Sequence, residues 1–254
     1  VQHGRILQQR LDALSEPPRA IGVHEGGARV KARPWRDRVV TSDGGGEVRV
    51  WDVPAARLLR TLRSPADASF AALDPTGRLI ATGTTGFIHP RGLCLFDLSA
   101  PPSAEPVPLL GAGQPYLNMM AFGPDGSWLG SIHAISVMLW NMTGPRSVVI
   151  GRQKAPGVGV VVTPDGRHVL SMSTEGVLRK WPLDPASGEG VQTLWTTPAG
   201  LNPGLEIDRR GRFAVVHDAN SAVTHVVPLD GSPPRTHVLA RPAGRSLQGW
   251  GALD

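Results

Sequence analysis

Hydrophobic and polar residues alternate over short stretches throughout this chain. Val48 and Val50 place apolar side chains at every second position before Trp51, and apolar and charged residues alternate between positions 28 and 32. A period of two is typical of a half-buried β-strand. The longest apolar run, at residues 158 to 162, is strand-sized and far short of the roughly 20 residues of a membrane span. The pattern therefore predicts a chain of short strands.

The strands group into a repeated unit. The first unit is predicted to place strands at residues 28 to 32, 38 to 41, around Trp51 and at 57 to 62, with a polar turn at 34 to 37. Equivalent units follow, and their anchor side chains lie 45, 44, 41 and 46 residues apart: Trp51, Phe96, Trp140, Trp181 and Val227. Four-stranded propeller blades repeat every 40 to 45 residues or so. The spacing predicts five consecutive four-stranded antiparallel sheets and almost no helix.

The chain resembles the WD-repeat β-propellers from about residue 24 to residue 254. The resemblance rests on the repeat period, on the Pro-Asp-Gly turns at 124 to 126 and 164 to 166, and on blade residues that we expect to be structural: His24, Trp51, Asp52, Phe96, Asp97, Trp140 and Trp181. It implies an all-β fold, a β-propeller of four-stranded antiparallel blades.

The resemblance also implies a hydrogen-bond set of a blade-start histidine, a serine or threonine, a turn aspartate and the tryptophan. His24 and Trp51 match it, but Gly45 stands six residues before Trp51, so that Asp43 is displaced. In the fourth unit, Ser173 and Glu175 stand eight and six residues before Trp181, and the other units lack the set.

The repeat sets expected boundaries. The blades are predicted at about residues 24–66, 67–112, 113–154, 155–198 and 199–243, with the start of another at 244–254 and the end of a preceding blade or a linker at 1–23. We expect an incomplete ring that is part of a longer repeat array; the alternative is a six-bladed ring closed by the two partial ends.

Composition refines this picture. The 31 glycines and 24 prolines indicate many tight turns, and the formal charge of +5 comes mainly from arginines scattered singly. Scattered arginines favour a basic surface over a nucleic-acid site, so nucleic acid is an unlikely partner. The single cysteine, Cys94, stands between two leucines and is expected to be buried, which fits a reducing, cytoplasmic compartment.

The chemistry of the chain does not favour catalysis. The sequence lacks zinc-peptidase, haem, hydrolase-elbow and P-loop motifs, and its eight histidines are dispersed over the units. We therefore predict no cofactor and no metal, and a protein that is not an enzyme. The alternative is a propeller enzyme or small-ligand receptor, which would need several His, Asp or Glu side chains to converge at a central channel.

Protein interaction is the favoured function. The enlarged turn at residues 83 to 92 carries Phe87, His89 and Arg91, and aromatic and arginine side chains are enriched at interface hot spots. Gln114, Tyr116, Arg152 and Lys154 are expected to extend the same surface. The sequence predicts a scaffold or regulatory module whose partner is another protein or a fused effector domain.

Overall fold

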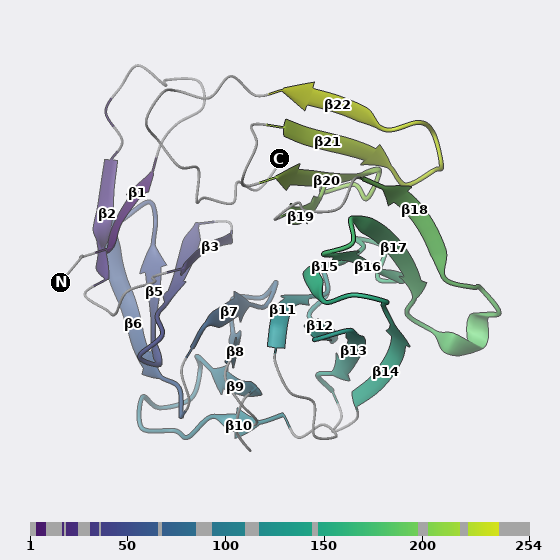
Figure 1. Ribbon diagram of the computed structural model, residues 1–254. Helices are drawn as coiled ribbons and strands as arrows, with labels where there is room; N and C mark the ends of the chain where they lie inside the picture. The colour runs from purple at the N-terminus through teal and green to yellow at the C-terminus, as the bar shows by residue number, and fades with distance from the viewer. Residues whose placement is uncertain are drawn as a thin grey trace. The chain divides into compact units, whose positions relative to one another are not determined.

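The protein is described by a computed structural model, shown in Figure 1. Described are residues 4–8, 17, 19–24, 31–35, 37–65, 68–84, 93–109, 117–143, 147–197, 203–218 and 223–238. Within these ranges the chain is all-β, and the one helical element is a single 3₁₀ turn, η1 (Pro185–Ser187). The chain forms two compact units.

The first unit comprises residues 1–73 and 77–110. It contains a two-stranded sheet, β1-β2, and two four-stranded sheets, β3-β4-β5-β6 and β7-β8-β9-β10, in which each strand pairs antiparallel with the next. The strands are β1 (Gly4–Gln8), β2 (Arg19–His24), β3 (Lys31–Trp35), β4 (Arg38–Ser42), β5 (Glu47–Asp52), β6 (Arg57–Arg63), β7 (Phe70–Leu73), β8 (Leu79–Gly83), β9 (Leu93–Asp97) and β10 (Val107–Pro108).

The second unit comprises residues 74–76 and 111–254 and contains three four-stranded antiparallel sheets, β11 to β14, β15 to β18 and β19 to β22. The strands are β11 (Leu117–Phe122), β12 (Trp128–His133), β13 (Ser136–Asn141), β14 (Ser147–Arg152), β15 (Gly157–Val162), β16 (His168–Ser173), β17 (Val177–Pro182), β18 (Gln192–Thr196), β19 (Pro203–Ile207), β20 (Phe213–Asp218), β21 (Val223–Pro228) and β22 (Arg235–Val238). The five four-stranded sheets confirm the predicted all-β fold, with sheets of the kind that form propeller blades.

Two details differ from the sequence prediction. The first strand of the first complete sheet is β3 (Lys31–Trp35), so Pro34 lies in a strand and not in the predicted turn. β3 is an edge strand, where a proline need not donate to a neighbour. The residues before the first complete sheet, predicted as the end of a preceding blade or a linker, include two paired antiparallel strands, β1 and β2.

Aspartates close the turns at one end of each sheet. Four sheets have an aspartate in the turn between their first and second strands. Its carboxylate accepts a hydrogen bond from the backbone N–H two residues further on, and a glycine at positive φ follows, as at Asp125 and Gly126 (φ 74°). Such Asx turns favour glycine where φ is positive. The first-turn aspartates are Asp74, Asp125, Asp165 and Asp208.

The third strand ends in the same chemistry. Asp52 accepts from Ala55 N at 2.9 Å, Asp97 from Ser99 N and Asn141 from Thr143 N, both at 2.8 Å. Hydrogen bonds from Arg78 and Ser99 hold the pKa of Asp97 well below its usual range. The Asp or Asn that follows Trp51, Phe96 and Trp140 thus closes the turn to the fourth strand, whereas Pro182 follows Trp181. We call this end of each sheet the Asp-turn end. The opposite end carries the turn between the second and third strands and the connection to the next sheet, and we call it the variable end.

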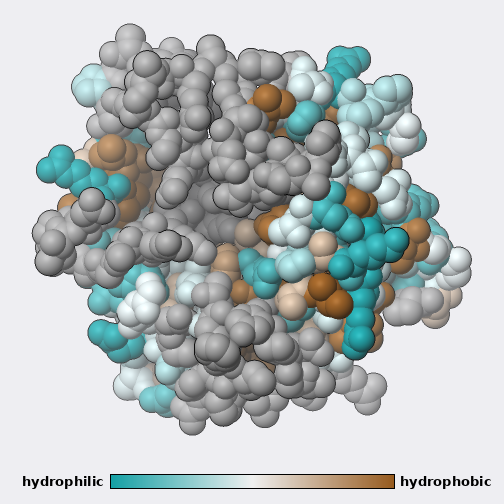
Figure 2. Space-filling view, in the orientation of Figure 1, coloured by the Kyte–Doolittle hydropathy of each residue, from teal (hydrophilic) through white to brown (hydrophobic). Residues whose placement is uncertain are grey.

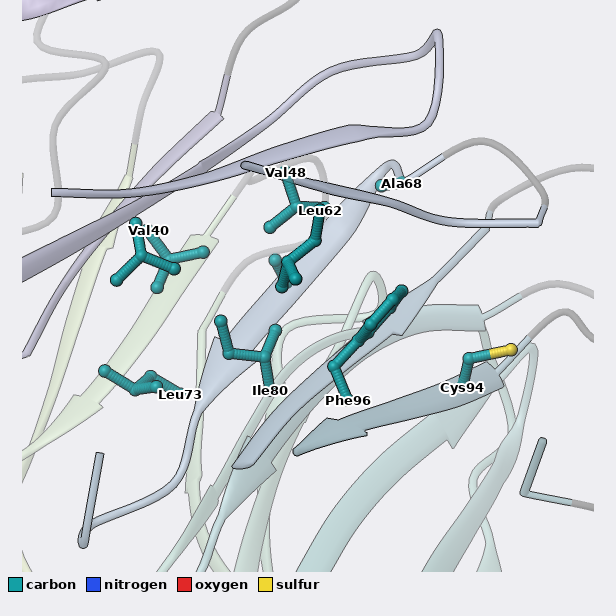
Figure 3. Packing of buried hydrophobic residues seen from close by; sticks show 10 residues of the cluster. Val40, Val48, Leu62, Ala68, Leu73, Ile80, Cys94 and Phe96 are labelled. Atoms are coloured by element: carbon teal, nitrogen blue, oxygen red, sulfur yellow. The ribbon is translucent and has the colours of Figure 1, made fainter. Parts of the chain in front are cut away.

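Apolar side chains fill the space between successive sheets. In the first unit, Val40, Val48 and Val50 of one sheet pack with Ile80 and Phe96 of the next, and all are almost fully buried. Figure 3 shows this cluster, with Leu62, Ala68, Leu73 and Cys94 completing it. Cys94 is 1% exposed and free. Burying branched side chains on both sides of a sheet provides the main favourable term in folding.

Two anchors, Trp51 and Trp181, pack against a glycine in the last strand of the preceding sheet. A Cβ on Gly22 would lie 2.2 Å from Trp51, and a Cβ on Gly151 would lie 2.0 Å from Trp181. Where the anchor is smaller, a larger residue from the preceding sheet belongs to the same core: Leu62 lies in the cluster of Phe96, and Trp195 packs against the cluster of Val227. The volume of each contact layer is therefore shared between two positions about 30 residues apart in the sequence.

We predict that Gly151→Ala destabilises the protein by about 1 to 3 kcal/mol, because the new methyl group overlaps the indole of Trp181. Urea unfolding measures the change. Gly190→Ala is the matched control, since no atom lies within 4 Å of its Cβ position. Combining Gly151→Ala with Trp181→Phe should cost less than the two single losses added together. Equal stability of Gly151→Ala and the control would contradict this packing.

Candidate functional site

A buried polar set stands beside Trp51. The indole Nε1 donates to Thr41 Oγ1 at 2.8 Å, and Thr41 Oγ1 lies 2.8 Å from His24 Nδ1. The threonine hydroxyl thus joins the indole to the imidazole ring of His24, whose other nitrogen is Nε2. That nitrogen faces Asp43 Oδ2 at 3.6 Å and Glu47 Oε1 at 3.7 Å. Burial, and then the nearby Arg49, lower the pKa of His24.

Two sheets of the second unit build partial versions of this set. Trp140 Nε1 donates to Ser131 Oγ at 2.7 Å, and Ser131 Oγ lies 3.1 Å from His133 Nε2. Trp181 Nε1 donates to Ser171 Oγ at 2.7 Å, and Ser171 Oγ donates to Gln153 Oε1 at 3.1 Å.

Where the anchor residue has no side-chain N–H, the second-strand position that carries the hydroxyl in the other sheets has no indole to accept from. Beside Phe96, Thr82 pairs with Ser64 at 3.3 Å, and beside Val227 the same position is Val216.

The hydroxyl lies nine or ten residues before the tryptophan, and not eight as the sequence pattern suggested. The pairing register explains the offset. Val39 stands opposite Trp51 and Val169 opposite Trp181, and the hydroxyl is two residues further along the same strand. Asp43 is therefore placed beside His24, although the sequence predicted it to be displaced. Ser173, the predicted partner, bonds Glu175 at 3.3 Å instead.

Arginines of the first unit are used within the fold. Four of them donate to backbone carbonyl oxygens of another strand or loop: Arg19 to Pro54, Arg38 to Gly77, Arg49 to Val23, and Arg60 to Leu98 and Ala100. Guanidinium groups that satisfy carbonyl oxygens are less available to phosphates. Part of the basic excess of the sequence is thus structural.

The variable end of the β11–β14 sheet presents an exposed isoleucine on a fixed turn. Ala134 and Ile135 form the two-residue turn between β12 and β13, with Ala134 at φ 50°. Three hydrogen bonds hold the turn, from Gln153 N to Ile135 O at 2.7 Å, from Gly157 N to Ala134 O at 2.9 Å, and from Ala134 N to Asn118 Oδ1 at 3.3 Å. The Ile135 side chain is 38% exposed. Positive φ at a residue other than glycine costs free energy, and such strain collects at functional sites.

Arg152 and Lys154 lie beside this turn, because they flank Gln153, whose backbone bonds Ile135. Both side chains are exposed, and among the described residues neither has an ion-pair partner. Lys154 also lies close enough to Glu175 to lower the pKa of that carboxyl, after the larger effect of Arg179. The result is a surface of one apolar side chain between two cations, which we call the Ile135 surface.

The other predicted contact residues cannot be placed on this surface. Phe87, His89 and Arg91, and likewise Gln114 and Tyr116, lie outside the described residues. The sequence analysis missed Ile135, because it stands within an apolar stretch that looks like one continuous strand. The signal that could have found it is the shortness of the gap between β12 and β13, which forces a tight turn.

The rest of the described surface carries no further cluster of candidate metal-ligating residues. Figure 2 shows apolar and polar residues interspersed over the described surface of one face. Among the described residues, no group of three or more His, Cys, Asp or Glu side chains could hold a metal ion. In that same part of the chain, no helix has the length and apolar character needed to cross a membrane.

Comparison with known proteins identifies a distant relative. The chain is 26% identical over 206 residues to transcription initiation factor TFIID subunit 5 of Caenorhabditis elegans, which is a WD-repeat protein. The match covers 76% of this chain and 29% of the relative, so the chain spans less than a third of the relative's length. No protein-family model matches the chain. The resemblance to WD repeats seen in the sequence is thus supported by a relative and by the form of the sheets.

We predict that the protein loses stability as the pH falls from 7 to 5. Burial lowers the pKa of His133 to about 4 and also lowers the pKa values of His24 and His217. The unfolded chain binds protons near pH 6.5 while these buried rings stay neutral, so stability present above pH 6.5 is lost toward pH 4. Each histidine contributes up to about 1.4 kcal/mol per pH unit.

Urea unfolding at a series of pH values measures this slope. His133→Gln keeps an amide at about the reach of the ring Nε2, which bonds Ser131, and should show a shallower decline than the unaltered protein. Identical slopes in the two proteins would mean that His133 titrates alike in the folded and unfolded chains.

Proposed function

We propose that this chain is a protein-interaction module, and that its partner contacts the Ile135 surface in the second unit. The carrying observation is an exposed apolar side chain on a turn fixed by three hydrogen bonds, flanked by two cations without ion-pair partners among the described residues. A rigid apolar anchor costs little entropy on binding, and charges around it steer and select the partner.

The difference between the two ends of the sheets supports this location. At the Asp-turn ends the same Asp chemistry recurs from sheet to sheet, which indicates a structural role. At the variable ends the turns differ, from Ala134-Ile135 between β12 and β13 to Thr174–Gly176 between β16 and β17. Loops that vary on a constant scaffold are the usual place for binding residues.

The comparison supports an interaction role in a general way. The relative is named as a subunit of a transcription initiation factor, and the match covers only part of it. By analogy we infer a scaffold or regulatory role for this chain, with another protein or a fused effector domain as the partner. Phe87, His89, Arg91, Gln114 and Tyr116 stay predicted contacts. We also infer a cytoplasmic location, because a single cysteine fits a reducing compartment.

The test compares how well two variants capture partner proteins, one altered at the variable end of a sheet and the other at an Asp-turn end. Ile135→Asp combined with Arg152→Glu and Lys154→Glu should reduce capture of proteins from a cell extract at least tenfold, since it removes the anchor and reverses both charges. Arg209→Glu, an exposed change at an Asp-turn end, is the control and should leave capture unchanged. Quantitative mass spectrometry of immobilised chains measures both. Equal loss in the two variants, or no loss in either, would refute the assignment.

A further inference from the structure

The fourth strand of the β11–β14 sheet is an open edge. β14 is the last strand of its sheet, and among the described residues no strand pairs with its outer side. The strand at the opposite edge, β11, lies against β15 of the next sheet (Figure 1). An edge strand presents a row of backbone N–H and C=O groups with which a further strand can pair.

β14 exposes apolar side chains on both faces of the sheet. Val148 is 42% exposed and Val149 is 39% exposed. They stand opposite Leu139 and Met138 of β13, and as neighbours in a strand they project to opposite faces. Residues 147 to 151 include no charged residue and no proline. A strand added to this edge therefore buries apolar surface on both faces.

The other fourth strands carry features that usually keep an edge strand from pairing, namely charged side chains, proline or short length. β6 has three arginines, β10 is two residues long and ends in Pro108, and β22 begins with Arg235. β18 has polar side chains at its exposed positions, and its Leu194 and Trp195 pack against a buried cluster. A bulge occurs in the pairing of β6, β14 and β18 alike, so it does not distinguish them. Among the described fourth strands, β14 alone combines adjacent exposed apolar residues with the absence of charge before its last residue.

Two cations lie where β14 ends. Arg152 is the last residue of the strand and stands opposite Ser136, which follows Ile135. Lys154 comes two residues later, and among the described residues neither cation has an ion-pair partner. A strand added along β14 thus reaches the Ile135 surface, and its residue at that end faces positive charge.

We propose that the partner adds an extended segment to the edge of β14 as a fifth strand, and that this segment carries an acidic residue opposite Arg152. The proposal rests on the proposed function and specifies how the partner approaches the Ile135 surface. Backbone hydrogen bonds give such a strand its affinity, and alternate side chains give it specificity. An antiparallel segment continues the order of the sheet, so its acid lies at its N-terminal end and apolar residues further on contact Val148 and Val149.

Charge favours a partner over a second copy of this chain. β14 contains no Asp or Glu, so a second copy that paired through the same strand would bring no acid to Arg152. The cations at the ends of both strands would then stay unpaired. A partner segment with an acidic end satisfies the charge as well as the open edge.

Three blocked hexapeptides test the backbone pairing. The parent peptide is Glu-Thr-Thr-Val-Val-Thr, and the other two carry N-methyl groups at its even or at its odd positions. Because alternate residues of a strand direct their N–H groups to the neighbouring strand, only one methylated peptide loses bonds to β14. That peptide should bind about tenfold more weakly or worse, since several hydrogen bonds are lost, and the other should bind like the parent. NMR titration of the unaltered chain measures the Kd values.

Charge exchange tests the register. Arg152→Glu should weaken binding of the parent peptide about fivefold and should favour a counterpart peptide with Lys in place of Glu. Val148→Asp should weaken binding of both peptides, because it removes an apolar contact and places a charge on the edge. Thr193→Asp, an exposed change on the edge strand β18, is the matched control and should leave binding unchanged.

No binding of the parent peptide, or an equal effect of the two methylation patterns, overturns the site. Dimerisation of the chain that Val148→Asp abolishes, measured by sedimentation, would overturn the choice of a partner and assign the edge to a second copy. The two proposals fail separately. Loss of partner capture by the triple variant of Ile135, Arg152 and Lys154 without peptide binding would remove the β14 site and leave the proposed function standing. Peptide binding with undiminished capture by that variant would remove the proposed function and leave the β14 site.

Discussion

Burial of an indole between neighbouring sheets is the constraint on which much of this structure depends. Trp51, Trp140 and Trp181 are each at most 5% exposed, so each indole N–H must find an acceptor within the protein. The acceptor is a hydroxyl on the second strand, two residues beyond the residue opposite the tryptophan. That hydroxyl in turn bonds a third group, which is a histidine in two sheets and a glutamine in the other. The buried indole N–H therefore requires a connected set of polar residues.

A sheet can lose these hydrogen-bonded polar residues when its anchor is not a tryptophan, because no buried indole N–H then needs an acceptor. Phe96 and Val227 bring no donor into the contact layer, and Val216 replaces the hydroxyl beside Val227 without leaving a polar group unsatisfied. Larger residues of the preceding sheet, Leu62 and Trp195, contribute volume to the cores of Phe96 and Val227. Close packing and satisfied hydrogen bonds can thus be kept while the repeat sequence diverges. This accounts for similar sheets built from units with few identical residues.

The same reasoning separates the two ends of the sheets. Asp-turn ends are held by local bonds from a carboxylate to backbone N–H groups within the turn, and these depend little on the neighbouring sheet. Variable ends are held by bonds between sheets, such as Gly157 N to Ala134 O, and they place side chains from different strands together. The Ile135 surface arises there because the turn between β12 and β13 is bonded to the connection that follows β14.

The sequence by itself determined the repeat, the four-stranded sheets, the aromatic anchors and the Asp-Gly turns, because each follows from periodicity or from bonds within a few residues. It also drew attention to Arg152 and Lys154. It did not predict the acceptors of the tryptophans, the size compensation of Gly151 with Trp181, or the exposure of Ile135. These depend on strand register, and bulges such as that between Val50 and Trp51 shift the register by one residue without a mark in the local pattern. Contacts between sheets combine positions about 30 residues apart, so only the tertiary structure could decide them.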